Sequence, residues 1–579
     1  MAKELDNVSR TPETGADYLA GVNEISLLAG RLLLTIGIDD ESNIRKACEL
    51  TDVIRGRIDG AKDADERFRL VEALLTFVGG VFQLVDRPFP PDLTNLEDYI
   101  IRLMQTDDSP RIREKIIQRY HYCGGLAFLE ALATVAATDK NDDVRYFAVL
   151  DSLWVARRRE DPLKVRVGQA AILKDAFASS DYMRRLAGIH ALPVAFEDGI
   201  LTPAEVEALL MDVAEREKDA TLQMEAGLRI GALAQKSEVL KKAVEDILGR
   251  KEGKESLRLG VEMGRAITDK RKETLSAYLH DSDTKKSVAA MLSLAAGEEE
   301  WAWAVLSDFI RGVSPDKKET PSILMRKLAL CVWLEAYDKQ VSKQYEKPEY
   351  PEQGMWKMTP QLEAFSLWLK NKTCWPLVGD SKTDPGLHFL CVAGVLSHHR
   401  LPEEWSDDQG FAKILETAAS SDFPIPSRLL LHNYILTQTG GPGRTEKAAS
   451  AFRNLVDNPA TPRDLKEQVV RIYAASIAAF RPESKEKART AFFDPAPADS
   501  KLAAMAAGIL ADPRGPSISY DTRRALFTFH FDVRRLLRGE VDEATSGNPL
   551  GTMLVEMWAK YPFTPEENET ARRIFFGAK

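Results

Sequence analysis

Three short stretches in the first half of the chain decide the fold that the sequence predicts. They read Asp143-Val144-Arg145-Tyr146-Phe147-Ala148-Val149-Leu150, Tyr182-Met183-Arg184-Arg185-Leu186-Ala187-Gly188-Ile189 and Thr221-Leu222-Gln223-Met224-Glu225-Ala226-Gly227-Leu228. In each stretch apolar residues recur at the spacing of an amphipathic helix, with a small residue one turn after the first apolar position. A small residue there lets a neighbouring helix approach closely.

The three stretches follow one another at a fixed interval. The first apolar residues, Val144, Met183 and Leu222, stand 39 residues apart each time. The same interval separates the small residues one turn later, Ala148, Ala187 and Ala226. A fixed period of this size indicates supersecondary units that stack on one another. Helical patterns at 164–178 and 204–217 fall between the stretches, so we expect each unit to be a pair of helices.

The start Asp143-Val144-Arg145, followed by alanine and apolar residues at a period near 40, resembles a HEAT repeat. The resemblance is clearest over residues 108–296, and it implies an all-α fold in which antiparallel helix pairs stack into an α-solenoid. Members of this family mostly bind other macromolecules and have many unrelated functions. The resemblance therefore implies a fold more than an activity.

Length and composition fit a large helical protein. A chain of 579 residues is too long for one compact core, but a solenoid can be long because each repeat contacts only its neighbours. Hydrophobic residues at 44% and charged residues at 29% are typical of a globular protein. The formal net charge of -10 argues against a surface devoted wholly to nucleic acid.

The cysteines and the N-terminal residues bear on where the protein works. The five cysteines are an odd number, lie far apart and include no C-x-x-C pair, which favours reduced thiols in the cytoplasm. The first residues are polar, and no apolar stretch is long enough to cross a bilayer. We therefore expect a cytoplasmic protein that does not associate with membranes.

Composition and the positions of proline and glycine divide the chain into segments. The sequence predicts a flexible tail at 1–15, the HEAT-like solenoid at 16–312, an apolar connecting helix at 313–340, a linker loop at 341–359 and a second, irregular helical domain at 360–579. The linker is predicted because Pro348, Pro351 and Gly354 exclude a continuous helix or strand.

Aromatic residues in and beside this linker are the first candidates for partner binding. Most tryptophans lie between 301 and 405, where Trp333 and Trp368 fit a helical core. Tyr345, Tyr350 and Trp356 lie in or next to the predicted linker, where a core is less able to cover them. Because tyrosine and tryptophan are enriched in binding hot spots, we expect these three residues to contact a protein partner.

Arginines in the repeats are the second candidates. Basic residues gather at Arg145, Arg157, Arg158, Arg184 and Arg185. Solenoids that bind nucleic acid place such residues against phosphates, and part of the family is similar to alkylpurine DNA glycosylases. The alternative is structural, since repeat arginines at the positions of Arg145 and Arg184 usually bridge neighbouring repeats. Cations at a helix end, as at Arg157 and Arg158, also suit the helix dipole.

Metal binding and catalysis have little support in the sequence. His388, Cys391 and His398 fall near one helical face, and imidazole and thiolate are ligands for zinc. Their spacing matches no common zinc pattern, and a cysteine in an apolar run usually packs as a small hydrophobic residue. No nucleotide-binding loop, nucleophile elbow or metalloprotease motif is present. We expect no metal, no cofactor and no catalytic residues.

The sequence therefore favours a non-enzymatic scaffold or adaptor that binds other proteins through a helical-repeat surface. The second hypothesis is a nucleic-acid-binding solenoid with a basic concave face. A third is an accessory helical protein of a bacterial defence system of the CRISPR type, cut in its linker by a protease, which only the size, the two helical halves and the linker suggest. An enzyme is the fourth, and no motif supports it.

Overall fold

The structure is a computed structural model that describes residues 41–84, 91–121, 123–155, 162–249, 254–313, 320–346, 359–396, 408–437, 444–478, 482–511 and 561–576. Every regular element in these ranges is a helix, which confirms the predicted all-α class. The chain folds as two compact units, Met1–Thr268 and Asp269–Lys579.

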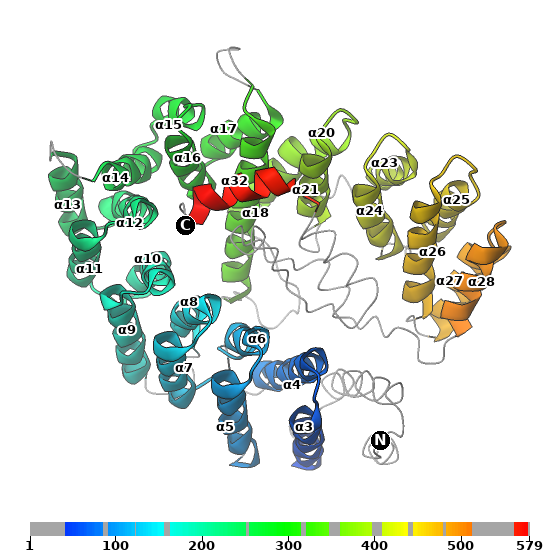
Figure 1. The fold of residues 1–579 in the computed structure, drawn as a ribbon, viewed down its shortest axis with the longest axis horizontal. Helices are drawn as coiled ribbons and strands as arrows, with labels where there is room; N and C mark the ends of the chain where they lie inside the picture. Colours follow the sequence, from blue (N-terminus) through cyan, green and yellow to red (C-terminus); the bar gives the residue numbers. More distant parts are fainter. Residues whose placement is uncertain are drawn as a thin grey trace. The chain divides into compact units, whose positions relative to one another are not determined.

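The helices of the first unit are α3 (Glu41–Gly60), α4 (Ala64–Leu84), α5 (Pro91–Thr106), α6 (Pro110–Tyr120), α7 (Leu126–Thr138), α8 (Asp142–Asp151), η1 (Ser152–Trp154), α9 (Pro162–Ala178), α10 (Tyr182–Glu197), α11 (Pro203–Arg216), α12 (Ala220–Leu233), η2 (Ala234–Lys236), α13 (Glu238–Gly249) and α14 (Glu255–Thr268). They form two rows, because each helix contacts the helix two places further along the chain (Figure 1). One row contains α4, α6, α8, α10, α12 and α14, and the other contains α3, α5, α7, α9, α11 and α13.

The three repeated stretches become α8, α10 and α12, which are successive helices of one row. Val144 and Leu222 are fully buried, and Met183 is 5% exposed. The alanines Ala148, Ala187 and Ala226 are each 0% exposed. The predicted helices and their buried small positions are therefore confirmed.

Two pairs of glycines bring α12 and α14 into backbone contact. A Cβ atom added to Gly260 would lie 2.2 Å from the carbonyl oxygen of Met224. One added to Gly227 would lie 2.3 Å from the carbonyl oxygen of Leu257. Gly231 and Gly264 make the same kind of contact one turn further along. Real Cβ atoms do not come this close, so the two helices can pack in this way only with glycine at these positions.

The helices of the second unit are α15 (Lys272–Leu279), α16 (Thr284–Ala296), α17 (Glu300–Arg311), α18 (Ile323–Glu346), α19 (Pro360–Ser366), the π-helix η4 (Leu367–Cys374), α20 (Trp375–Val378), α21 (Pro385–Leu396), α23 (Asp408–Ala419), α24 (Ile425–Thr437), α25 (Arg444–Val456), α26 (Arg463–Ala478), α27 (Pro482–Phe493), α28 (Ser500–Ala511) and α32 (Pro565–Phe576). Contacts again link alternate helices, with α16, α18, α21, α24, α26 and α28 in sequence and α23, α25 and α27 beside the last of them.

The predicted segment boundaries differ from the two compact units. The division between the units falls at Thr268, whereas the sequence places its main boundary at 341–359. The first part of that predicted linker, up to Glu346, is helical because α18 continues through it. Residues 347–358 and the predicted tail at 1–15 lie outside the described residues.

Aromatic packing supports the core of the second unit. Trp303 stacks on Phe365 with ring centroids 4.9 Å apart, and Trp333 lies 6.0 Å from the same ring. Trp333 is fully buried, as predicted, while Trp368 is only half-buried. In the part of the chain that the structure describes, no helix combines the length and the apolar character that a membrane span requires.

Candidate functional site

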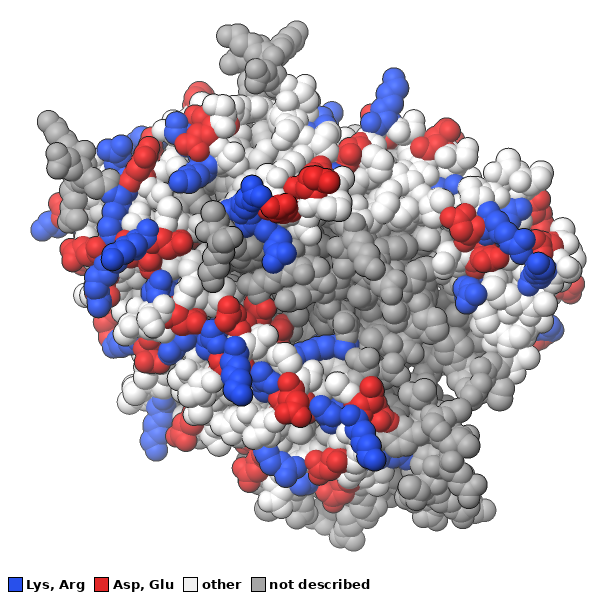
Figure 2. Space-filling view, in the orientation of Figure 1, with Lys and Arg blue, Asp and Glu red and all other residues white. Residues whose placement is uncertain are grey.

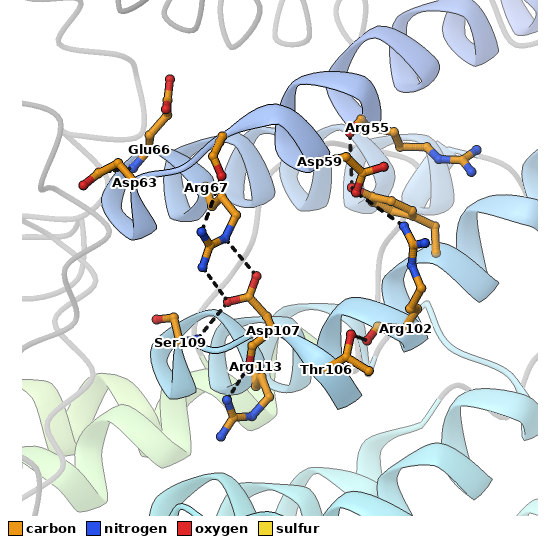
Figure 3. A network of polar contacts seen from close by, with 12 residues as sticks. Arg55, Asp59, Asp63, Glu66, Arg67, Arg102, Thr106, Asp107, Ser109 and Arg113 are labelled. Atoms are coloured by element: carbon orange, nitrogen blue, oxygen red, sulfur yellow. Dashed lines mark hydrogen bonds and ion pairs between the residues drawn. The ribbon is translucent and has the colours of Figure 1, made fainter.

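A ladder of arginine contacts links successive helices of one row in the first unit. In each rung an arginine donates to a carbonyl six residues earlier and to a carboxylate that is the N-cap of the next helix in that row or stands two residues before that N-cap. The rungs are Arg67 with Ala61 and Asp107, Arg113 with Asp107 and Asp139, Arg145 with Asp139 and Asp181, and Arg185 with Ser179 and Glu217. Figure 3 shows the first rung, where Arg67 points at Asp107 from the facing helix.

The carboxylate contacts of the last three rungs are short, whereas those of Arg67 with Asp107 are 3.1 and 3.2 Å long. The Nε atom of Arg113 lies 2.7 Å from Asp139 Oδ2, and Nη2 of Arg145 lies 2.6 Å from Asp181 Oδ2. Arg185 Nε lies 2.7 Å from Glu217 Oε2. Charge-assisted hydrogen bonds of this length are stronger than neutral ones, so each of these three rungs ties one helix firmly to the next.

The local sequence sets the ladder through the helix N-caps. Asn141 caps α8 by accepting from the backbone N–H groups of Asp143 and Val144, and Asp181 caps α10 by accepting from Arg184. The arginine of each rung stands four residues after its cap. Side chains on a helix point back toward its N-terminus, so a guanidinium at this position reaches the turn before the helix.

The N-caps also correct one expectation. The 39-residue spacing makes Arg184 the equivalent of Arg145, but the bridging residue is Arg185. The N-caps Asn141 and Asp181 are one residue further apart than the 39-residue spacing. The bridging arginine of α10 therefore stands one position later than that spacing predicts. Arg184 instead pairs with Asp175 and donates to Ser179 Oγ in its own helix pair.

The carboxylates balance the positive charges of the ladder arginines, which stay protonated. Burial alone would lower the pKa of Arg145, but the hydrogen bond and the charge of Asp181 outweigh it, so the pKa is raised. Its side chain is 13% exposed and also contacts Asp142. Arg145, Arg184 and Arg185 therefore each form an ion pair within this fold, with Asp181, Asp175 and Glu217 respectively.

The other predicted partner-binding residues cannot be placed in the site. Arg157, Arg158, Tyr350 and Trp356 lie outside the described residues. Tyr345 falls in the last turn of α18, and its side chain is also outside the described part. Their proposed contacts with a partner stay predictions.

The predicted zinc ligands lie in a packed interior. His388 has a hydrogen-bond partner at each ring nitrogen, with Nδ1 2.8 Å from Ser427 Oγ and Nε2 3.1 Å from the carbonyl oxygen of Val378. Burial, together with the neighbouring Cys374, raises the pKa of Cys391 and so disfavours the thiolate. His398 lies outside the described residues. Within the described ranges, no three His, Cys, Asp or Glu side chains are placed to hold a metal ion.

A buried lysine lies near these cysteines and is absent from the sequence-based candidates. Lys370 stands on the π-helix Leu367–Cys374 and has no exposed surface. Burial lowers its pKa to about 7, although Cys374 acts in the opposite direction. Its Nζ atom lies 5.6 Å from the centre of the Tyr337 ring. The wide turn of a π-helix is the signal for this site, but such a turn cannot be predicted from residue spacing.

An exposed apolar pair on α9 is the second feature that sequence reasoning missed. The exposed fraction is 69% for Leu163 and 63% for Val167, which stand one turn apart on the same face. Lys164 and Arg166 beside them are exposed as well. A signal was present, because Leu163, Val165 and Val167 cannot all face one side of a helix. Only Val165 is buried.

Charges of both signs are mixed on the face of the molecule that Figure 2 shows. On the face that Figure 2 draws, Lys and Arg side chains are interspersed with Asp and Glu and form no stripe of one sign. Comparison with protein-family models and with curated proteins finds no match.

Proposed function

We propose that this protein is a helical-repeat scaffold of the α-solenoid type that binds a protein partner through α9. The observation that carries the proposal is the exposed apolar pair Leu163 and Val167 on one helix of the array. Covering an aliphatic side chain of this size contributes roughly 1.5–3 kcal/mol, so the pair could anchor a contact.

The arginine ladder supports a scaffold role for the helices around α9. It repeats one contact along the row from α4 to α12, as expected for stacked repeats that share their interfaces. α9 belongs to the other row, but it packs on α10, a ladder helix, and this contact holds its exposed face in a fixed position. Residues on rigid elements form more precise binding sites than residues on loops.

The same ladder makes a nucleic-acid-binding role the weaker hypothesis. Binding to phosphates needs lysines and arginines that can exchange their counterions for phosphate oxygens. Arg145 and Arg185 already contact Asp181 and Glu217 at hydrogen-bonding distance. The formal net charge of -10 also opposes association with a polyanion.

A photo-crosslinking amino acid at position 167 tests the proposal in the native host. The matched control carries the same group at Val313, another exposed valine, which is 47% exposed and lies outside the ladder. We expect a protein to be captured from position 167 and not from position 313. The binding of that purified protein should then weaken at least about ten-fold on Val167→Asp, and should be unchanged on Val313→Asp.

Two outcomes would count against a protein-binding α9. Binding of the captured protein to the Val167→Asp variant as tightly as to wild type would place its contact elsewhere. Loss of the capture on nuclease treatment would favour the nucleic-acid hypothesis.

A further inference from the structure

The last helix that the structure describes, α32, packs on α18 of the same unit (Figure 1), and Tyr561 and Pro562 just before it contact α21. Lys327 of α18 joins the three elements. Its Nζ atom lies 2.9 Å from Asp384 Oδ1, just before α21, and 2.9 Å from Glu567 Oε2 of α32. Only 3% of the Lys327 side chain is exposed, so the docked helix helps to enclose a buried charge.

A close backbone approach accompanies this ion pair. A Cβ atom added to Gly386 would lie 2.2 Å from the carbonyl oxygen of Pro562. Next to it, the rings of Phe389 and Tyr561 meet edge to face with centroids 5.3 Å apart. We call Lys327, Asp384, Gly386 and Phe389 the α32 dock. Only glycine at position 386 leaves room for the incoming chain.

The docked segment caps the N-terminus of its own helix. The backbone N–H of Thr564 donates to Glu567 Oε2 at 2.9 Å, and the N–H of Glu567 donates to Thr564 Oγ1 at 3.2 Å. This reciprocal pair is a capping box, which satisfies two N–H groups without help from the dock. Phe563, Ala571 and Phe575 are buried. The segment therefore carries its own cap together with the apolar and acidic groups that the dock receives.

The dock keeps its charge balance without α32. Lys327 and Asp384 already form a neutral pair, and Glu567 adds a second carboxylate to the same lysine. Removing one partner of a buried ion pair is severe when it leaves a charge uncompensated, but here Asp384 remains. Along the chain, residues 512–560 separate α28 from Tyr561, so α32 is not the direct continuation of the elements that form its dock.

We propose that the α32 dock is a helix-exchange site, which the α32 of a second copy of this chain can fill in place of the copy's own helix. An identical helix offers the same contacts to Lys327, Gly386 and Phe389. Exchange of an identical element is a low-cost route to a dimer, because no new interface has to be built. The sequence of α32 thus encodes both an intramolecular contact and a contact between copies.

Two full-length variants test the exchange when they are mixed. Glu567→Lys places a second cation against Lys327 and removes the carboxylate of the capping box, which releases the variant's own helix and leaves its dock open. Gly386→Ala puts a Cβ atom against Pro562, which blocks the dock and leaves the helix unchanged. Hydrogen–deuterium exchange read by mass spectrometry follows residues 561–576, and the two helices differ in mass at position 567.

Alone, each variant should exchange at 561–576 at least ten-fold faster than wild type. When both are mixed at about 100 µM, within reach of the effective concentrations of tethered modules, the unchanged helix of the Gly386→Ala chain should regain its protection. A species of twice the chain mass should form at the same time. The charge-reversed helix should stay unprotected. Glu567→Gln serves as recipient if the Glu567→Lys chain does not fold.

Three results would overturn the proposal. Wild-type protection in both recipient variants alone would mean that the Lys327 contact does not hold the helix. Folded variants that fail to restore protection on mixing would mean that the dock accepts only its own helix. Binding of a synthetic peptide of residues 560–579 to the Glu567→Lys chain, without exchange between copies, would assign the dock to a foreign helix instead of a second copy.

Discussion

At the scale of single residues, the ladder arginines show how one side chain can serve two helices. Arg145 donates to the carbonyl of Asp139 in the turn before its own helix and to Asp181, the N-cap of the next helix in the row. Asp181 in turn accepts from the backbone N–H of Arg184. A single substitution at this rung therefore removes an ion pair and disturbs a helix start.

We expect Arg145→Ala to lower the free energy of unfolding of the first unit by roughly 1.5–3 kcal/mol, the value of a hydrogen bond to a charged partner. Arg166→Ala is the matched control, because Arg166 is an exposed arginine on α9. It should change stability by no more than about 0.5 kcal/mol. Urea denaturation followed by circular dichroism measures both. Equal effects of the two substitutions would show that the rung does not stabilise the row.

Buried histidines make a second residue-scale prediction, on acid stability. Burial lowers the pKa of His121 to about 4, and its Nδ1 atom lies 3.0 Å from the carbonyl oxygen of Ile117. Because the folded pKa lies below the ordinary value of about 6.5, the unfolded chain binds the proton first as pH falls. Stability from this group is complete above about pH 6.5 and declines as pH falls toward 4.

Replacing His121 by glutamine should therefore reduce the acid sensitivity. Between pH 6.5 and 4 the stability of wild type relative to His121→Gln should fall by up to about 1.4 kcal/mol per pH unit. Above pH 7 the difference should be constant. Curves of unfolding free energy against pH that run parallel down to pH 4 would contradict a neutral, buried His121.

At the scale of helices, the glycine contacts between α12 and α14 bring the backbones of two helices of the first unit into direct contact. Gly227 and Gly231 of α12 face Gly260 and Gly264 of α14, with backbone atoms where side chains normally stand. Glycine weakens an isolated helix, so these residues lower helix propensity in exchange for packing.

Alanine substitutions should change stability in opposite directions at a closely packed glycine and at a glycine with open space around it. Gly260→Ala places a Cβ atom against the Met224 carbonyl and should destabilise the protein by roughly 1–3 kcal/mol through overpacking. Gly56 of α3 has no atom within 4 Å of an added Cβ, so Gly56→Ala should stabilise by about 0.4–1 kcal/mol. Thermal melting of both variants measures the difference. A stabilising Gly260→Ala would contradict the close contact.

Helices and buried faces were predictable from the sequence, but side-chain partners were not. The periodicity of Val144 and Leu222 identifies buried positions because a helix face repeats regularly. The bridging role of Arg185 depends on one extra residue between caps, which spacing alone does not reveal. In the sequence His388 is a candidate zinc ligand, but in the structure its two ring nitrogens contact Ser427 and Val378. Such partners come from other elements, so only the fold supplies them.

At the scale of the whole molecule, the charge pattern argues for limited affinity for nucleic acid. Positive and negative side chains alternate on the face shown in Figure 2, and the formal net charge is -10. Salt screens such a surface within about 8 Å at physiological ionic strength, so distant charges add little attraction.

We expect no specific binding to duplex DNA or to single-stranded RNA at 150 mM salt. Fluorescence anisotropy with labelled oligonucleotides should give dissociation constants in the non-specific range of about 10⁻⁴–10⁻⁶ M or weaker. Lowering the salt should strengthen any residual binding equally for all sequences. Nanomolar binding that distinguishes one sequence would favour the nucleic-acid hypothesis over a protein-binding scaffold.

In the π-helix Leu367–Cys374, the number of residues decides which side chains face the interior. It joins α19 to α20 without a break, and it carries about one residue more per turn than an α-helix. Deleting one residue there would let the segment close into ordinary α-helical turns, and every later side chain would rotate by about 100°. Thr373 and Cys374 would then turn away from the interior. The rotation of α20 about the helix axis, relative to α19, therefore depends on the number of residues between them. A substitution would leave this number unchanged.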